Sequence, residues 1–190
     1  MVIDLISKRR STYAFTTKSI EQEKLNSLFE AAHLAPSSSN MQPWRYIYAT
    51  QENPEEFKLL FDCLSEGNQR WVKNAFMLIL SVAEMSYTYK NEHFPNKYAR
   101  HDVGTAMGML MIQAASMGLV THPMGGFDPE KARINLQIHE PFEPVAMIAV
   151  GYPGTTEGLP EDLVKREHSE RKRKPLDEIV FRGKWHTPSL

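Results

Sequence analysis

The segment Pro36-Ser-Ser-Ser-Asn-Met-Gln-Pro-Trp44 is the most informative stretch of this sequence. Between its two prolines stand five side chains that can hydrogen-bond: three serines, Asn40 and Gln42. Such a loop can read the donors and acceptors of a heterocycle while proline and main-chain atoms pack on its face. The same residue types also favour an ordinary connection between a helix and a strand, so the segment by itself leaves both interpretations open.

The flanks of this segment predict the elements that it connects. Upstream, Ser19-Ile-Glu-Gln22 fits a capping box. The apolar residues that follow at helical spacing predict a helix that ends before Pro36. Downstream, residues 44–49 are aromatic and branched, which is typical of a strand. A short helix is expected over residues 2–10.

The rest of the chain mixes helices and strands without a regular repeat. Residues 102–117 form the clearest predicted helix, which is apolar on nearly every side. This pattern predicts burial inside the domain or at a subunit interface. Other expected elements are buried strands at 76–82 and 145–150, helices at 54–65 and 128–136, an irregular aromatic excursion at 86–100, and a turn at 151–154. We therefore expect one α+β domain over residues 1–190.

Composition and charge argue against several classes of protein. The chain carries 22 Lys+Arg and 23 Asp+Glu, a balance that gives no reason to expect a nucleic-acid partner. It has no apolar run of about 18 residues and no secretory signal in its first ten residues, so we expect a cytoplasmic protein without a membrane partner. Neither a glycine-rich nucleotide loop nor a serine-hydrolase elbow is present.

The cysteine and the histidines give no sign of a metal site. Cys63 is the single cysteine and is interpreted as a small core residue within a helix. The seven histidines are scattered and form no closely spaced pair, so no metal is expected.

Three further places gather polar or flexible residues. Arg9-Arg10-Ser11-Thr12 offers two guanidiniums and two hydroxyls, which suit a phosphate and equally suit a solvated helix end. Gly125-Gly126 would let main-chain N–H groups approach a flat ligand, or would form a plain turn. The run Arg171–Lys174 fits a phosphate clamp, a nucleic-acid patch or simply a solvated surface.

Taken in this order, these segments resemble the nitroreductase family of flavin enzymes. The resemblance covers nearly the whole chain and implies an α+β fold with a small, mostly antiparallel sheet flanked by helices. It also implies an intertwined homodimer with one FMN at each end of the shared interface, and C-terminal residues that reach the partner subunit. It is carried by Arg9-Arg10-Ser11, Ala35-Pro36-Ser37-Ser38, Asn40-x-Gln42-Pro43-Trp44, Asn68, Asp102-Val-Gly104, Gly125-Gly126-Phe127 and Arg171-x-Arg173.

The resemblance assigns cofactor roles to particular residues. It implies that the FMN phosphate is held by Arg9, Ser11, Arg171 and Arg173, with Arg10 alongside. It implies that the isoalloxazine ring lies against four residues of the second subunit, Pro36, Ser37, Ser38 and Asn40. The pyrimidine edge of the ring would meet Asn68, and its N5 edge would lie near Met124, Gly125 and Gly126.

Two positions depart from the family pattern. Tyr13 and Trp71 stand where the family often has Lys or Arg beside flavin N1 and O2. A positive charge there stabilises the anionic reduced flavin, so its loss is expected to lower the reduction potential. Arg10, Arg70 and Lys73 are the cations that could compensate.

The implied activity is a ping-pong oxidoreductase. NADH or NADPH would transfer hydride to flavin N5, and a flat small-molecule acceptor such as a nitroaromatic or a quinone would then take the electrons. No side chain need act as a general acid or base, so no catalytic residue is assigned. Candidates to stack on the acceptor, or merely to pack a variable loop, are Tyr87, Tyr89, Phe94 and Tyr98. The alternatives are a flavin-consuming or dehalogenating member, and a non-catalytic flavin-binding or regulatory protein.

Overall fold

Strand β3 (Met77–Glu84) forms the centre of the sheet in the computed structural model, which describes residues 1–187. Its first seven residues are all buried. Successive side chains enter two different cores, because side chains alternate along a strand: Met77 packs into one core and Leu78 into the other. The prediction of a buried central strand is confirmed.

The neighbours of β3 pair with it in antiparallel fashion, β2 on one side and β7 on the other. The long strand β7 also pairs antiparallel with β6 and β1. A parallel bridge joins Ser11 to Thr121. These pairings confirm the expected small, mostly antiparallel sheet. The strands are β1 (Phe15–Thr16), β2 (Trp44–Thr50), β6 (Val120–Met124) and β7 (Phe142–Pro153).

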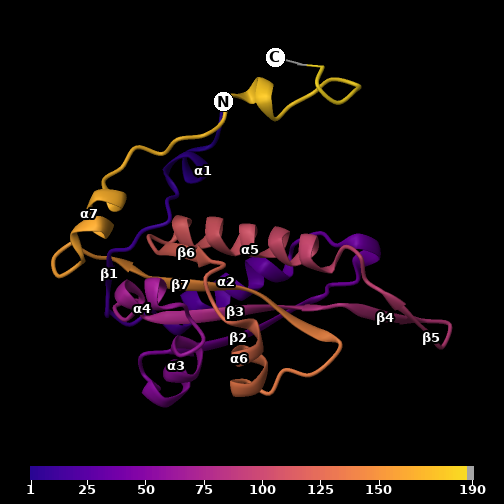
Figure 1. Cartoon of the computed structure of the whole chain (residues 1–190), viewed down its shortest axis with the longest axis horizontal. Helices are drawn as coiled ribbons and strands as arrows, with labels where there is room; N and C mark the ends of the chain where they lie inside the picture. The colour runs from indigo at the N-terminus through magenta and orange to yellow at the C-terminus, as the bar shows by residue number, and fades with distance from the viewer. Residues whose placement is uncertain (188–190) are drawn as a thin grey trace.

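Helices cover both faces of the sheet. In Figure 1, α5 runs along one face, while α3 and α6 lie across the other. One core joins the sheet to α2 and α5 through residues such as Leu28 and Leu110. The second core joins it to α3, α4 and α6 through residues such as Leu60 and Trp71. The helices are α2 (Gln22–His33), α3 (Pro54–Phe61), α4 (Glu66–Val72), α5 (Ala99–Ser116) and α6 (Pro129–Asn135).

Helix α5 is the long apolar helix that the sequence predicts, although it begins three residues earlier, at Ala99. One of its faces is buried against the sheet and α2. On its other side Gly104 is exposed, and Met109 keeps 39% of its surface exposed. Within one chain, therefore, one side of this apolar helix is only partly covered, which is the arrangement expected of a subunit interface.

The excursion over residues 86–100 is regular, so its interpretation as an irregular segment was wrong. Strands β4 (Ser86–Tyr89) and β5 (Glu92–Pro95) form a hairpin that projects from the body (Figure 1). Its two turn residues, Lys90 and Asn91, have φ angles of 48° and 65°, as a tight hairpin turn requires. The hairpin is mostly exposed on both faces, so it lacks the apolar alternation that marks a half-buried strand.

The beginning of α2 also differs from the prediction. The helix starts at Gln22 with Glu21 as its N-cap, and no side chain caps it. The predicted capping box with Ser19 is therefore wrong, because Ser19 lies two residues outside the cap. The first helix of the chain, α1 (Asp4–Lys8), is shorter than predicted and has no buried residue.

Two other predicted boundaries are wrong. The helix expected at residues 54–65 ends at Phe61, and α4 is a separate helix that the sequence reading missed. Cys63 lies in the connection between them and is only 1% exposed, so it is a core residue outside a helix. The turn expected at residues 151–154 is largely strand, because β7 continues to Pro153 and pairs there with β1.

The segment that begins the chain and residues 168–187 leave the body side by side (Figure 1). Helix α7 (Glu161–Glu167) is followed by residues 168–187, here called the C-terminal arm, which include the short helix η2 (Leu176–Glu178). The arm is almost entirely exposed and extends past α1 and away from the sheet (Figure 1). No helix within residues 1–187 is long and apolar enough to cross a membrane.

Candidate functional site

Three arginines from opposite ends of the chain gather beside α1, and we call this group the arginine cradle: Arg9, Arg171 and Arg173. Arg171 donates hydrogen bonds to the main-chain oxygens of Arg9, at 3.0 Å, and Ser7, at 2.6 Å. Burial, and then the positive charges of Arg171 and Arg173, hold the pKa of Arg9 below its ordinary value. Within residues 1–187, Arg9 Nη1 is buried without a hydrogen-bond partner, so the cradle is a site prepared for an anion.

A clamp holds the arm against the N-terminal segment. The Glu167 carboxylate accepts hydrogen bonds from Thr12 Oγ1, at 2.7 Å, and from the Tyr13 main-chain N–H, at 2.6 Å. Arg10 donates to the main-chain oxygens of Glu167, at 3.3 Å, and Ser169, at 2.5 Å. Arg10 therefore braces the arm, while the nearby Ser11 is exposed.

The loop that opened the sequence analysis is held in an uncommon conformation. Ser39, Asn40 and Gln42 have φ angles of 49°, 55° and 48°, a region that serine and glutamine rarely adopt. The Gln42 main-chain N–H donates to Ser37 Oγ at 2.9 Å. Such backbone strain persists where the surroundings enforce it, most often at functional sites.

The carboxylate of Asp102 supports this loop from within. Asp102 is 3% exposed and accepts a 2.9 Å hydrogen bond from the Ser38 main-chain N–H. Its other oxygen lies 3.0 Å from His101 Nδ1. The loop residues Pro36, Ser37 and Ser38 line a cavity of about 300 Å³ beside the start of α5.

Asn68 and the paired glycines come together at the end of β6. Asn68 Nδ2 donates to the Gly126 main-chain oxygen at 2.9 Å. A Cβ atom on Gly126 would stand 2.8 Å from Asn68 Nδ2 and 2.9 Å from Ser65 Oγ, so this close approach requires glycine. Gly125 is exposed, whereas Met124 is buried at the end of the strand.

An aromatic cluster lies between this corner and the cradle. The rings of Tyr13, Trp71 and His122 have centroids 4.5 to 5.3 Å apart. His122 Nδ1 lies 2.8 Å from the Thr12 main-chain oxygen, which assigns the proton to Nδ1. Burial, with a contribution from the charge of Arg9, lowers the pKa of His122. Trp71 is 1% exposed, so it presents its surface to the core and to Tyr13.

The cations that could compensate for Tyr13 and Trp71 are differently placed. Arg10 is engaged in the clamp, and Arg70 pairs with Asp162 at 2.6 Å. Lys73 is exposed at the end of α4. Within the described part of the chain, no group of His, Cys, Asp or Glu side chains is arranged to hold a metal ion.

The predicted site residues therefore form two groups rather than one. The first joins the arginine cradle, the aromatic cluster and the Asn68–Gly126 corner. A cavity of about 410 Å³ beside Arg9 is also lined by Ala115 and Gly118, at the C-terminal end of α5. The second group is the loop of residues 36–44, at the N-terminal end of α5. With a rise of 1.5 Å per residue, Asp102 beside the loop and Ala115 beside the cradle lie about 20 Å apart along the helix.

The supporting roles of three residues were missed from the sequence: Asp102, Glu167 and Thr12, of which Thr12 was named only as a hydroxyl that could suit a phosphate. Asp102 was named from the sequence only within the motif Asp102-Val-Gly104. The hydrogen bond between Thr12 and Glu167 joins residues 155 positions apart, and that between Ser38 and Asp102 joins residues 64 apart. Contacts this distant in the sequence leave no local pattern, so a single sequence carries no signal for them.

The fold and these two groups describe the class of the protein: an α+β protein with a cluster of arginines at one end of α5 and a polar loop at the other. The chain belongs to the nitroreductase family, since the profile of that family matches residues 6–61 and 49–152. The match includes the loop of residues 36–44, Asn68 and Gly126. The arm arginines lie beyond its end.

Several proteins resemble this chain over most of its length. A crystal structure of an oxidoreductase containing FMN superposes with a TM-score of 0.94 at 34% identity, covering 98% of this chain and 94% of that one. A 15.4 kDa protein of Mycolicibacterium smegmatis is 32% identical over 70% of this chain and 87% of its own. An FMN reductase [NAD(P)H] of Bacillus subtilis is 25% identical over 88% of this chain and 74% of its own.

The residues present fit FMN. The buried, unpartnered Arg9 Nη1 and the two arm arginines suit a phosphate dianion. Asn68 and the exposed Gly125 offer polar groups to a ring edge. The second group, around the loop of residues 36–44, suits the face of a flat ring, although it lies at the other end of α5.

Proposed function

We propose that this protein uses NAD(P)H to reduce a flat acceptor, a nitroaromatic or a quinone, by a ping-pong mechanism. By its family it is an FMN-dependent NAD(P)H oxidoreductase. When bound, FMN supplies the redox chemistry: it can accept a hydride and pass its two electrons to an acceptor. In balance, NAD(P)H, a proton and a quinone give NAD(P)⁺ and a hydroquinone. With a nitroaromatic acceptor the products are a nitroso compound, NAD(P)⁺ and water.

One observation carries this proposal: the buried Arg9 Nη1 without a partner in residues 1–187. Burying a guanidinium beside two others is costly unless an anion completes the site. Arg9, Arg171 and Arg173 would hold the cofactor phosphate, and the exposed hydroxyl of Ser11 would add a hydrogen bond. The strength of this grip comes from charge-assisted hydrogen bonds.

The ring would extend from the cradle toward the Asn68–Gly126 corner. Asn68 would hydrogen-bond its pyrimidine edge, and the main chain at Gly125 and Gly126 would lie near N5. Tyr13 would face the N1 and O2 side with a neutral aromatic ring, with Trp71 packed behind it at a centroid distance of 5.3 Å. A neutral edge is expected to give a lower reduction potential than a cationic one.

A complete site requires a second copy of the chain. The cradle and the loop of residues 36–44 stand about 20 Å apart along α5, so one chain does not bring both to one cofactor. Two chains packed through the uncovered side of α5, which includes Gly104 and Met109, would place the loop of each beside the cradle of the other. The exposed C-terminal arm would then reach the partner subunit.

The test is spectroscopic. Purified protein, or protein incubated with FMN and then desalted, should be yellow and should bleach when NADH or NADPH is added without oxygen. Addition of a quinone or nitroaromatic should restore the colour, and the double-reciprocal plots of a ping-pong enzyme should be parallel. Protein that retains no flavin after reconstitution would contradict the proposal.

A second candidate is a flavin-binding protein without turnover, and the aromatic cluster favours it. Tyr13, Trp71 and the neutral His122 leave this edge of the site without a positive charge, which disfavours reduction of the flavin. A yellow dimer that neither NADH nor NADPH bleaches would support this second candidate. Flavin-consuming and dehalogenating activities would be recognised by release of reduced FMN or of halide.

A further inference from the structure

A second hollow lies where the β4–β5 hairpin leaves the body, and we call it the hairpin pocket. Its volume is about 350 Å³, which is within the range of small-molecule sites. Ser38 and Tyr98 line both this pocket and the cavity of the 36–44 loop. A molecule in the hairpin pocket would therefore lie next to the surface that we assign to the flavin ring.

The apolar wall of the pocket suits a flat aromatic molecule. The rings of Tyr87 and Phe94 stack across the hairpin with centroids 5.7 Å apart and planes 27° apart. Met41 is 36% exposed and Tyr98 is 60% exposed, so both have surface available to a ligand. Aromatic and thioether groups of this kind pack well on a planar ring.

The charge on the wall is positive. Lys97 lines the pocket, and no aspartate or glutamate does. Within residues 1–187 no carboxylate forms an ion pair with Lys97. The nearest buried carboxylate, Asp102, already accepts the Ser38 N–H and lies beside His101.

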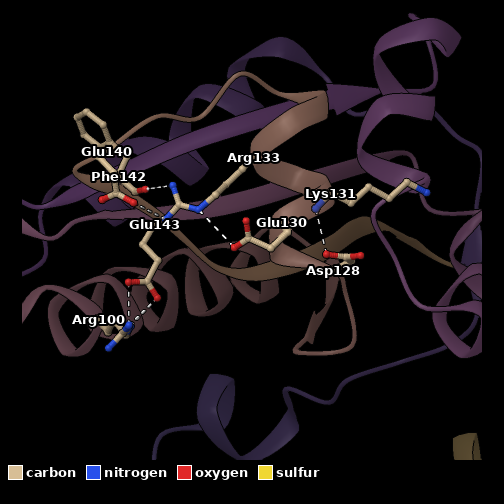
Figure 2. A network of polar contacts seen from close by, with 8 residues as sticks. All are labelled: Arg100, Asp128, Glu130, Lys131, Arg133, Glu140, Phe142 and Glu143. Carbon is tan, nitrogen blue, oxygen red and sulfur yellow. Dashed lines mark hydrogen bonds and ion pairs between the residues drawn. The ribbon is translucent and has the colours of Figure 1, made fainter.

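Two arginines near the base of the hairpin are already paired with carboxylates. Arg100, three residues after Lys97, forms a two-oxygen ion pair with Glu143, at 2.5 and 2.7 Å (Figure 2). Arg45 pairs with Glu84 at 2.6 Å. Lys97 therefore leaves a net positive charge at the edge of an aromatic pocket.

We propose that the hairpin pocket binds a flat aromatic acceptor that carries an anionic substituent such as a carboxylate. The ring would lie against Tyr87 and Phe94, and the anion would meet the Lys97 ammonium. This inference rests on the proposed reductase function, since the acceptor is the molecule that takes the electrons. The inference further specifies that the substrate is an anion and that Lys97 recognises its charge.

The first test compares 4-nitrobenzoate with 4-nitrobenzamide, which have nearly the same shape and differ in charge. Native enzyme should show a kcat/KM about fivefold higher for the anion, chiefly because its KM is lower. A partly solvated ion pair with Lys97 gives a stabilisation of about this size. Lys97→Met, which keeps the apolar stem, should abolish this ratio, and Lys97→Arg should preserve it. Lys90→Met, at the hairpin tip and outside the pocket, should leave the ratio unchanged.

The second test needs no reduction and separates the two proposals. Calorimetry on FMN-loaded protein should show benzoate binding about fivefold more tightly than benzamide, with the difference lost in Lys97→Met. If no acceptor is reduced but this binding difference is found, the pocket assignment stands and the reductase function fails. If acceptors are reduced without a preference for the anion, and benzoate binds no better than benzamide, the pocket assignment is overturned.

Discussion

The two ends of α5 carry the two halves of the site, and they are built by opposite means. At the C-terminal end, the arginines of the cradle are carried by the residue that follows α1, a helix with no buried residue, and by an arm that is exposed almost throughout. Polar bonds such as those of Glu167 hold these segments in place. At the N-terminal end, the loop of residues 36–44 is tied to the buried Asp102 and continues into the buried Trp44.

This difference indicates that cofactor affinity and protein stability depend on the same residues at the loop of residues 36–44, but not at the cradle. The cradle has few apolar contacts, so its substitution should change cofactor affinity without changing the stability of the protein without FMN. The loop is tied to the main core, so its support contributes to stability and to binding together. Each of the following predictions tests this contrast.

The largest effect is expected for Arg9→Ala. Loss of the buried guanidinium from the phosphate site should weaken FMN binding about 100-fold, or by about 3 kcal/mol, because several charge-assisted hydrogen bonds are lost. The free energy of unfolding of the FMN-free protein should not fall, because the substitution also removes the unpartnered N–H group and its repulsion by Arg171 and Arg173. Quenching of FMN fluorescence and urea unfolding measure the two quantities. Lys172→Ala, an exposed cation between the arm arginines, should leave FMN affinity nearly unchanged.

Asp102→Asn should act on both quantities. The amide cannot supply a charged acceptor to the Ser38 N–H, so we expect about 2 kcal/mol of destabilisation in the absence of FMN, together with weaker FMN binding. Asp4→Asn, which removes a carboxylate that is 79% exposed, should change stability by less than about 0.5 kcal/mol. If the two variants were equally stable in urea, the loop end of α5 would contribute no more to stability than the cradle end, and the contrast would be contradicted.

Glu167→Gln should loosen the arm alone. Its amide replaces one carboxylate oxygen by a donor, so one of the bonds to Thr12 and the Tyr13 N–H is lost. The docking of the arm on the body, and not the folding of the body, is then weakened by about 1 kcal/mol. FMN affinity should fall about fivefold, while the unfolding curve of the FMN-free protein stays in place. A fall in stability without a fall in affinity would show that Glu167 belongs to the fold and not to the cradle. Glu170→Gln, exposed on the arm, is the matched control.

The smallest effect concerns pH. Burial holds the pKa of His122 below its ordinary value of 6.5, so below that pH the unfolded chain takes up a proton that the folded chain does not. The stability contribution of neutral His122 is therefore complete above about pH 6.5 and declines below it, until the lowered pKa is reached. Between about pH 7.5 and 5.5, native protein should lose more stability than His122→Gln, as measured by urea unfolding at each pH. The exposed His33→Gln should keep the native pH dependence.

The sequence predicts the parts of this molecule whose signal is local. Unbroken apolar runs mark β3 and α5, and short motifs mark the arginines, the loop of residues 36–44 and Gly126. The β4–β5 hairpin escaped prediction because both its faces are mostly exposed and it has no buried stripe. Asp102 and Glu167 gained their roles from contacts with distant segments, which neither periodicity nor spacing records.

The central claim is that the cradle of one chain and the loop of another complete one FMN site. Two inactive variants test it most directly: Arg9→Ala, which lacks the phosphate grip, and Ser38→Trp, which fills the cavity of about 300 Å³ where the ring would lie. The two chains are co-expressed with different affinity tags, and the mixed dimer is purified through both tags. One of its two sites then carries both defects and the other carries neither.

The measurement is the amount of FMN bound per mixed dimer, read from its absorbance after reconstitution. Dimers of either single variant should retain almost no flavin, whereas the mixed dimer should retain about one FMN per two chains. A mixed dimer that binds no more FMN than the single variants would contradict a site shared between two chains.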